Sequence, residues 1–103
     1  MLQQLKNLLF GQTVDYKTML ANGAVIIDVR SPQEYATGHI DGAKNIPLPQ
    51  LGQQISNLKQ TGKPVITCCA SGMRSSSAAS QLRIAGIEAV NGGGWYGLAS
   101  KLK

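Results

Sequence analysis

Two short, continuous apolar runs constrain the fold of this chain more than any other feature. They are AVIIDV, residues 24–29, and VITCC, residues 65–69. A run that is apolar nearly throughout, rather than at every second position, is typical of a strand buried on both faces. A third, shorter strand is predicted at IEAVN, residues 87–91. Helical signals lie between these runs, and strands alternating with helices predict a parallel sheet covered by helices.

The helix signals are clearest directly after the first apolar run. In SPQEYATG, Ser31 can cap a helix, Pro32 suits its first position and Glu34 completes a capping box. A short extended piece is predicted near residues 43–46. Further helices are predicted at residues 2–9, 15–22, 51–58, 75–86 and 95–103, with a flexible turn at the glycines of residues 92–94.

Length and charge narrow the classes of function. The chain has 103 residues, which suits one domain, residues 1–103, with its own hydrophobic core. Its net charge of +5 favours an anionic partner. The basic residues are scattered, without interleaved aromatic residues, so no nucleic-acid partner is expected. No apolar run is long enough to span a membrane and no signal peptide is recognisable, so no membrane partner and a cytoplasmic location are expected.

The loop after the second apolar run carries the chemistry. Cys69 ends the predicted strand, four residues follow, and Arg74 leads into a helix starting near Ser75. A loop that curls around the cysteine directs its backbone N–H groups inward, as in anion-binding nests. The helix N-terminus, the Arg74 charge and the hydroxyls of Ser71 and Ser75 all favour the thiolate of Cys69. The same cradle would hold an anionic substrate against the sulfur.

The two cysteines are adjacent, and they are not predicted to form a disulfide. Neighbouring residues on a strand point to opposite faces of the sheet. Cys68 is therefore expected to point away from the loop, into packing. The alternative for Cys69 is a small buried core residue, as free cysteine often is. Its position at the strand end, with a glycine and an arginine following, favours a reactive cysteine.

Three motifs, in order, resemble those of the rhodanese family. CASGMRS, residues 69–75, is similar to the active-site loop C-x-x-G-x-R-S of single-domain members. Residues 25–47 resemble the family's upstream signature, an apolar strand ending in D-x-R, then E-[YF], then G-H-I-x-G-A. NGGGW, residues 91–95, resembles the glycine pair after its last main strand. The resemblance implies an α/β fold with a central parallel sheet of about five strands flanked by helices.

The resemblance also implies sulfur transfer. Rhodaneses take a sulfane sulfur from a donor such as thiosulfate, hold it as a cysteine persulfide and pass it to cyanide or a thiol. Carried over, Cys69 is the nucleophile, and Arg74 attracts and orients the anionic donor. No metal or organic cofactor is implied. The implied substrate-binding groups are the backbone N–H groups of the loop and helix start: Ala70, Ser71, Gly72, Met73, Arg74 and Ser75.

A few residues outside the loop are candidates for a supporting role. Asp28 and Arg30 form the family's D-x-R, and they either brace loops as an ion pair or, in the case of Arg30, help to attract anions. His39 is the only histidine, but a stabilised thiolate needs no base, so a structural role is expected. Trp95 and Tyr96 are expected to pack rather than to contact substrate.

Two alternatives remain open at this point. Cell-cycle tyrosine phosphatases and some arsenate reductases share the rhodanese fold, but they have five residues between cysteine and arginine, where this chain has four. A persulfide carrier that delivers sulfur to a protein partner differs from the small-molecule enzyme only in its acceptor. The family often has Tyr or Phe before the catalytic cysteine, where this chain has Cys68.

Overall fold

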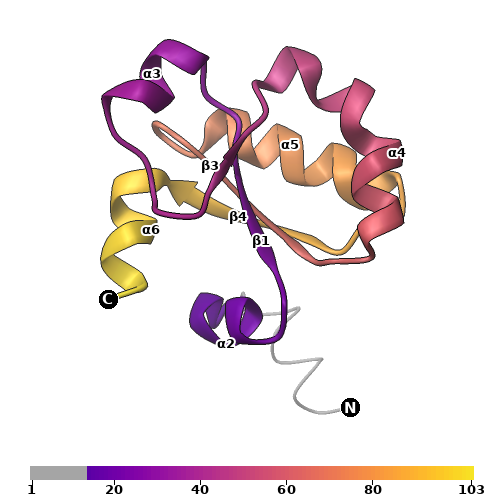
Figure 1. Cartoon of the computed structure of the whole chain (residues 1–103), viewed down its shortest axis with the longest axis horizontal. Coiled ribbons are helices and arrows are strands. Elements are labelled where there is room, and N and C mark those ends of the chain that lie inside the picture. The colour runs from indigo at the N-terminus through magenta and orange to yellow at the C-terminus, as the bar shows by residue number, and fades with distance from the viewer. Residues whose placement is uncertain (1–13) are drawn as a thin grey trace.

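The computed structural model of the chain describes residues 14–103 (Figure 1). The helix predicted at residues 2–9 lies outside the described residues. Helices and strands alternate along the chain from α2 to α6. The α/β class expected from the apolar runs is therefore confirmed.

The sheet of the described residues has four strands, all parallel, in the order β2-β1-β3-β4. They are β1 (Val25–Asp28), β2 (Lys44–Asn45), β3 (Val65–Cys69) and β4 (Ala89–Gly94). The count of about five strands implied by the family resemblance is therefore one more than the described residues contain. The two continuous apolar runs form the central strands β1 and β3, as burial on both faces requires.

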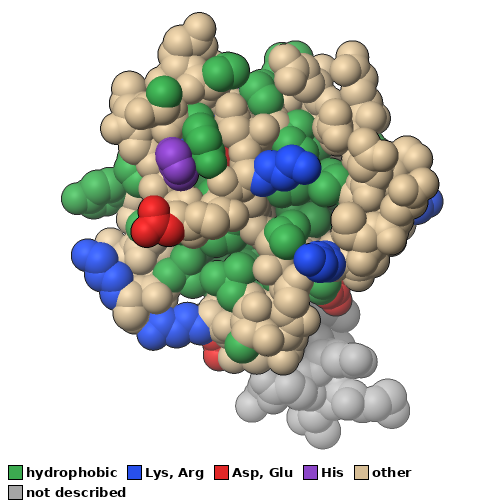
Figure 2. Space-filling model, in the orientation of Figure 1, with side chains coloured by type: hydrophobic (Ala, Val, Ile, Leu, Met, Phe, Trp, Pro, Cys, Tyr) green, Lys and Arg blue, Asp and Glu red, His purple; other side chains and the backbone are tan. Residues whose placement is uncertain are grey.

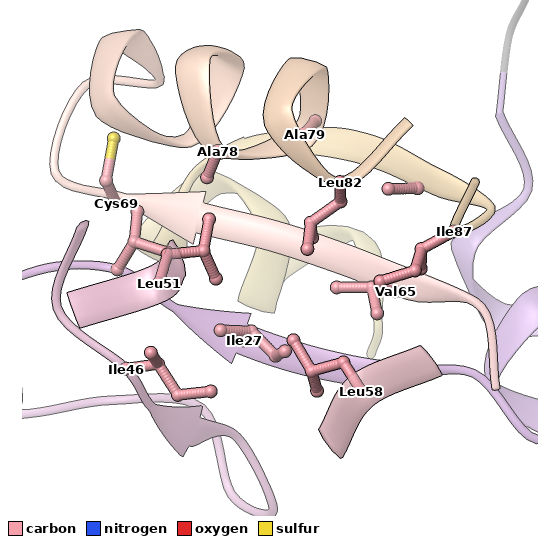
Figure 3. Packing of buried hydrophobic residues seen from close by; sticks show 12 residues of the cluster. Ile27, Ile46, Leu51, Leu58, Val65, Cys69, Ala78, Ala79, Leu82 and Ile87 are labelled. Carbon is pink, nitrogen blue, oxygen red and sulfur yellow. The ribbon is translucent and has the colours of Figure 1, made fainter. Parts of the chain in front are cut away.

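Two helices cover one face of the sheet, namely α4 (Leu51–Thr61), preceded by the 3-10 helix η1 (Leu48–Gln50), and α5 (Met73–Ile84) (Figures 1 and 3). Their apolar side chains pack against Ile27 and Val65 in one buried cluster, which Figure 3 shows from close by. This cluster also includes Cys69. The candidate nucleophile is thus anchored in the core by its backbone and Cβ.

The opposite face is covered by α2 (Tyr16–Ala21) and α6 (Trp95–Lys101), with α3 (Pro32–Thr37) near the carboxyl ends of the strands (Figure 1). Leu98 and Cys68 belong to the second buried cluster, which lies on this side. Cys68 and Cys69 therefore lie in separate clusters on opposite faces, as the alternation along a strand predicts.

The predicted capping box of α3 is present. The Ser31 hydroxyl accepts the backbone N–H of Glu34, and the Glu34 carboxylate accepts the backbone N–H of Ser31, both at 3.2 Å. Pro32 is the first residue of the helix. This short helix therefore has its start, and with it the position of Glu34, determined locally.

The prediction for the last strand was wrong in its bounds. β4 spans Ala89–Gly94, so the glycines expected to form a flexible turn belong to the strand. A Cβ at Gly92 would lie 2.8 Å from the carbonyl oxygen of Thr67, and one at Gly94 would lie 2.8 Å from that of Ala70. Glycine is needed here because the β4 backbone approaches β3 and the loop after it more closely than a side chain allows.

On the face shown in Figure 2, the Lys and Arg side chains lie at several separate places. Within residues 14–103, no helix combines the length and apolar character needed to cross a membrane. Three large apolar side chains are well exposed on the described surface, those of Met73, Ile84 and Tyr96. Met73 is 80% exposed and lies in the first turn of α5, next to the candidate active-site loop.

Candidate active site

Cys69 lies at the carboxyl end of β3, and α5 begins at Met73, two residues before the start predicted near Ser75. The turn between them depends on Gly72, which has φ +99° and precedes the helix. A Cβ there would also lie 3.3 Å from Cα of Gly93 on β4. The positive φ strains any other residue and the short distance leaves little room for a side chain, which explains the glycine of the C-x-x-G pattern. Figure 3 shows the Cys69 sulfur directed toward this loop.

Three polar groups surround the sulfur of Cys69. The backbone N–H groups of Gly72 and Ser75 donate to Sγ at 3.0 and 3.3 Å. The hydroxyl of Ser75 lies 3.3 Å from Sγ. The sulfur and the hydroxyl are both buried, since Cys69 and Ser75 are both 0% exposed. In a site that excludes water, donors directed at one atom stabilise negative charge on it.

These donors decide the pKa of Cys69. Burial alone raises the pKa of this thiol, and it is the largest single influence. The hydrogen bonds from the side chain and N–H of Ser75, with those from the backbone of Gly72 and Ser71, act in the opposite direction and together outweigh burial. The net effect is a lowered pKa, so Cys69 loses its proton more readily than an ordinary cysteine does.

Cys68 has the opposite environment. Burial among apolar side chains, followed by the negative charge of Asp28, raises the pKa of its thiol to about 12, although Arg30 offsets part of the effect. Cys68 therefore remains a protonated, unreactive thiol at neutral pH. Both cysteines are free.

Arg74 is held by an ion pair at the partly exposed edge of the site. Its Nη1 and Nη2 donate to Oε1 and Oε2 of Glu34 at 2.7 and 2.9 Å, a bidentate pair about 40% exposed on both sides. The Arg74 guanidinium lowers the pKa of Glu34 to about 2. The interpretation of Glu34 as a helix cap was incomplete, because the same carboxylate also holds the arginine of the loop.

Arg30 and Asp28 form a buried ion pair, with Nη2 of Arg30 2.7 Å from Oδ2 of Asp28. Arg30 also donates to the carbonyl oxygen of Gly38 at 2.7 Å and lies over the ring of Trp95, 4.8 Å from its centroid. Arg30 is only 3% exposed, and each of these contacts braces the chain around α3. The geometry favours the structural role for this pair over attraction of anions.

His39 and Tyr96 lie at the surface. The ring of His39 stacks on Tyr35 with centroids 3.7 Å apart, and its Nδ1 lies 2.8 Å from the Tyr35 carbonyl oxygen. Tyr96 is well exposed, while Trp95 packs in the second cluster against Arg30. None of these contacts involves the Cys69 sulfur.

Sequence reasoning missed Asn91. Its Oδ1 accepts the Ser75 hydroxyl at 2.7 Å and the Gly93 N–H at 2.9 Å, and its Nδ2 donates to the Gly72 carbonyl oxygen at 3.1 Å. Asn91 thus contacts both Gly72 and Ser75, the two residues whose N–H groups donate to the sulfur. The only signal in the sequence is a polar residue at the end of an apolar strand, before three glycines.

The fold and the site define a class of protein: a parallel α/β domain in which a buried cysteine at the carboxyl end of a central strand accepts two backbone N–H groups at its sulfur. The profile of the rhodanese-like domain matches residues 12–101, and the chain belongs to this family. The predicted family is therefore confirmed.

The chain is also similar in sequence to individual proteins. An uncharacterized protein of Bacillus subtilis, YqhL, is 50% identical over 60 residues, which cover 58% of this chain and 47% of YqhL. Thiosulfate sulfurtransferase GlpE of Ectopseudomonas mendocina is 37% identical over 70 residues, covering 68% of this chain and 63% of GlpE. The chain thus spans about half of the first relative and somewhat less than two thirds of the second.

Solved structures share the fold. The human single-domain sulfurtransferase superposes with a TM-score of 0.68 at 28% identity, over 86% of this chain and 92% of that one. A rhodanese with anions from E. coli gives 0.66 at 32% identity, over 72% and 89%. The reduced CoADR-RHD of Bacillus anthracis gives 0.71 at 31% identity, over 94% of this chain but 18% of that one.

Proposed function

We propose that this protein is a sulfurtransferase that moves a sulfane sulfur from thiosulfate, or a similar anionic donor, to cyanide or a thiol through a persulfide on Cys69. The observation that carries the proposal is the Cys69 sulfur at the strand end with the N–H groups of Gly72 and Ser75 at 3.0 and 3.3 Å. A thiolate held by fixed donors is a nucleophile that needs no separate base.

The transfer balances in two steps. The Cys69 thiolate attacks the outer sulfur of thiosulfate, a new S–S bond forms, and the bond to the sulfonate sulfur breaks as sulfite leaves with the electron pair. The protein then carries a persulfide anion. In the second step cyanide, or an acceptor thiolate, attacks the outer sulfur and the thiolate of Cys69 is restored as the leaving group.

The loop supplies the binding groups. The negative charge moves outward from Sγ to the transferred sulfur, and the backbone N–H groups of residues 70–75 are the donors available along this path. Arg74 orients the donor anion, which competes with the Glu34 carboxylate for the same guanidinium. Because Cys69 is fully buried, we expect uptake of the donor to need a shift of the loop over it, where Ala70 and Ser71 are exposed.

The names of relatives support the choice of donor, since GlpE of Ectopseudomonas mendocina is a thiosulfate sulfurtransferase. A reducing compartment such as the cytoplasm suits the reaction, because it keeps the Cys69 thiol from being lost to disulfide formation. A protein that accepts the sulfur is compatible with the same persulfide and would replace only the second step.

Intact mass measurement after incubation with thiosulfate tests the proposal. One sulfur atom should be added, peptide mapping should place it on Cys69, and cyanide should remove it as thiocyanate. An unchanged mass, or sulfur on Cys68, would overturn the assignment. Phosphatase assays with an aryl phosphate provide the contrast: the four-residue loop between Cys69 and Arg74 predicts no turnover.

A further inference from the structure

The hydrogen bonds around Ser75 contain a conflict over one proton. Oγ of Ser75 lies 2.7 Å from Oδ1 of Asn91 and 3.3 Å from Sγ of Cys69. A serine hydroxyl carries a single proton, so it can donate to one of these two acceptors at a time. Asn91 Oδ1 and the Cys69 sulfur therefore compete for the same donor.

The charge on the sulfur decides which acceptor receives the proton. When Cys69 is a thiol, its S–H can donate to the Ser75 oxygen while the Ser75 hydroxyl donates to Asn91. When Cys69 is a thiolate, the hydroxyl gains more by turning to the negative sulfur, because hydrogen bonds to charged acceptors are stronger. Asn91 Oδ1 then keeps the N–H of Gly93 at 2.9 Å. In both states every group has a partner.

Because the site is buried, water cannot replace the hydrogen bond that the losing acceptor gives up. Cys69 and Ser75 are fully buried, so water does not supply a substitute partner. Among the residues that the structure describes, each buried side-chain nitrogen and oxygen has a hydrogen-bond partner. A second bond holds Ser75 in position, since its carbonyl oxygen accepts the Thr67 hydroxyl at 2.7 Å. The hydroxyl of Ser75 can thus rotate while its backbone stays in place.

We propose that Asn91 is a positioning residue that competes with Cys69 for the Ser75 hydroxyl proton, releasing it to the thiolate and taking it back when sulfur transfer moves the charge outward. The first half of this proposal concerns only the thiol and thiolate of Cys69. The second half rests on the proposed persulfide. There, Sγ becomes neutral, the outer sulfur bears the charge, and the hydroxyl returns to Oδ1 of Asn91.

The proposal and a simple bracing role for Asn91 predict opposite shifts in the pKa of Cys69 when the Asn91 side chain is removed. Asn91 Nδ2 also holds the Gly72 carbonyl oxygen at 3.1 Å, so loss of the side chain removes a brace of the loop. A loosened loop would weaken the donors to sulfur and raise the pKa of Cys69. Removal of Asn91 Oδ1 would leave only the Gly93 carbonyl oxygen, 3.5 Å from Ser75 Oγ, to compete with the thiolate for the proton, and would therefore lower that pKa. The direction of the shift separates the two roles.

The experiment measures the rate of Cys69 alkylation by iodoacetamide against pH, with peptide mapping to exclude Cys68. Asn91→Leu should shift the midpoint down by roughly half a pH unit, and Ser75→Ala should shift it up by about one unit. In the Ser75→Ala background, Asn91→Leu should have no further downward effect. Cys68 and Arg74, the titratable and charged groups that interact with Cys69, are present in every variant.

Asn45 provides a matched control. Its side chain donates to the carbonyl oxygens of Asp28 and Arg30 at 3.0 and 2.9 Å, so Asn45→Leu removes a similar brace at another strand end. It should leave the midpoint of Cys69 unchanged. If Asn91→Leu does not fold, Asn91→Ala provides the same readout.

An upward shift in Asn91→Leu, no shift, or a downward shift that persists without the Ser75 hydroxyl would overturn the proposal. Alkylation needs no sulfur donor, so this result is independent of whether the protein accepts sulfur from thiosulfate. For the persulfide half, well above both midpoints, the thiosulfate rate of Asn91→Leu should fall several-fold more than its iodoacetamide rate, because Oδ1 is no longer there to take back the hydroxyl proton when the charge leaves Sγ. A thiosulfate rate that falls no more than the iodoacetamide rate would refute this half alone.

Discussion

Cys68 and Cys69 are neighbours in the chain and are both 0% exposed. The pKa values of their thiols nevertheless depart from that of an ordinary cysteine in opposite directions. The pKa of Cys68 is raised to about 12, and that of Cys69 is lowered. Burial raises both, so burial is not what separates them. Thiol reactivity in this site therefore depends on whether hydrogen-bond donors point at the sulfur, and they do so on only one face of the end of β3.

On the Cys68 face, the second cluster supplies apolar side chains, and the Asp28 carboxylate adds a repelling negative charge. On the Cys69 face, the strand ends where the loop turns, and the N–H groups of Gly72 and Ser75 converge on the sulfur. A one-residue step along a strand is enough to exchange these environments, because successive side chains point to opposite faces.

The largest expected effect is loss of sulfur transfer on removing the nucleophile. Cys69→Ala should reduce thiosulfate turnover roughly a thousandfold or more, since no other group can carry the sulfur. Cys68→Ala is the matched control and should retain most of the activity. Thiocyanate formation measures both. Comparable loss in the two variants would mean that the adjacent cysteines act together and would break the comparison.

The next effect concerns stability at alkaline pH. A thiol whose pKa is raised by folding contributes stability in full below the unfolded value, and this contribution is lost as pH rises above it. For Cys68 the window runs from about 8.5, the value of a free thiol, up to about 12. The free energy of unfolding should fall by about 1.4 kcal/mol for each pH unit within it.

Cys69 should act in the opposite sense. Its lowered pKa means that its contribution is complete above the unfolded value and is lost as pH falls through the folded value. Urea unfolding across the alkaline range, in wild type and Cys68→Ala, isolates the Cys68 contribution by difference. Equal slopes in the two proteins would show that Cys68 titrates normally.

Arg74 lies at the start of α5, on the face of the sheet that carries Cys69, so its variants test only the Cys69 environment. If it orients an anionic donor, Arg74→Ala should raise the thiosulfate KM about tenfold. Arg74→Lys should recover part of the loss, because lysine keeps the charge but not the planar fork. Glu34→Gln removes the competing carboxylate and should lower the KM a few-fold. Steady-state kinetics with thiosulfate measures all three.

An uncharged persulfide donor is the control for these variants. If Arg74 only braces the loop, Arg74→Ala would lose as much activity with the uncharged donor as with thiosulfate, and its thermal stability would drop. A Glu34→Gln variant that binds thiosulfate more weakly would likewise assign the ion pair a bracing role.

The smallest effect is the packing contribution of Cys68 at neutral pH. Cys68→Ala should cost about 1 kcal/mol of unfolding free energy, since it leaves a small cavity in the second cluster. Cys68→Ser should cost more, because its hydroxyl would need a partner in an apolar site. Urea unfolding at neutral pH checks the order. A serine variant as stable as the alanine variant would mean that this site is more polar than its surroundings indicate.

Much of the fold could be predicted because its signals are local. Continuous apolar runs identified β1 and β3, and Ser31, Pro32 and Glu34 located the start of α3. The opposite orientations of Cys68 and Cys69 followed from strand alternation alone. The bounds of β4 could not be predicted, because a run of glycines is typical of a turn. Only the close approach of the neighbouring backbone shows why glycines stand in this strand.

What the sequence by itself determined is the order of strands and helices and the loop with Cys69, Gly72 and Arg74, because these depend on residues close together in the chain. Only the tertiary structure decided which distant groups meet that loop. Glu34 holds Arg74 across 40 residues, and Asn91 holds Ser75 across 16. The Asn91 contact depends on the parallel register of β4 beside β3 and on the close approach that Gly92 and Gly94 permit, and the Glu34 contact depends on how α3 lies beside the start of α5. No local pattern encodes these arrangements.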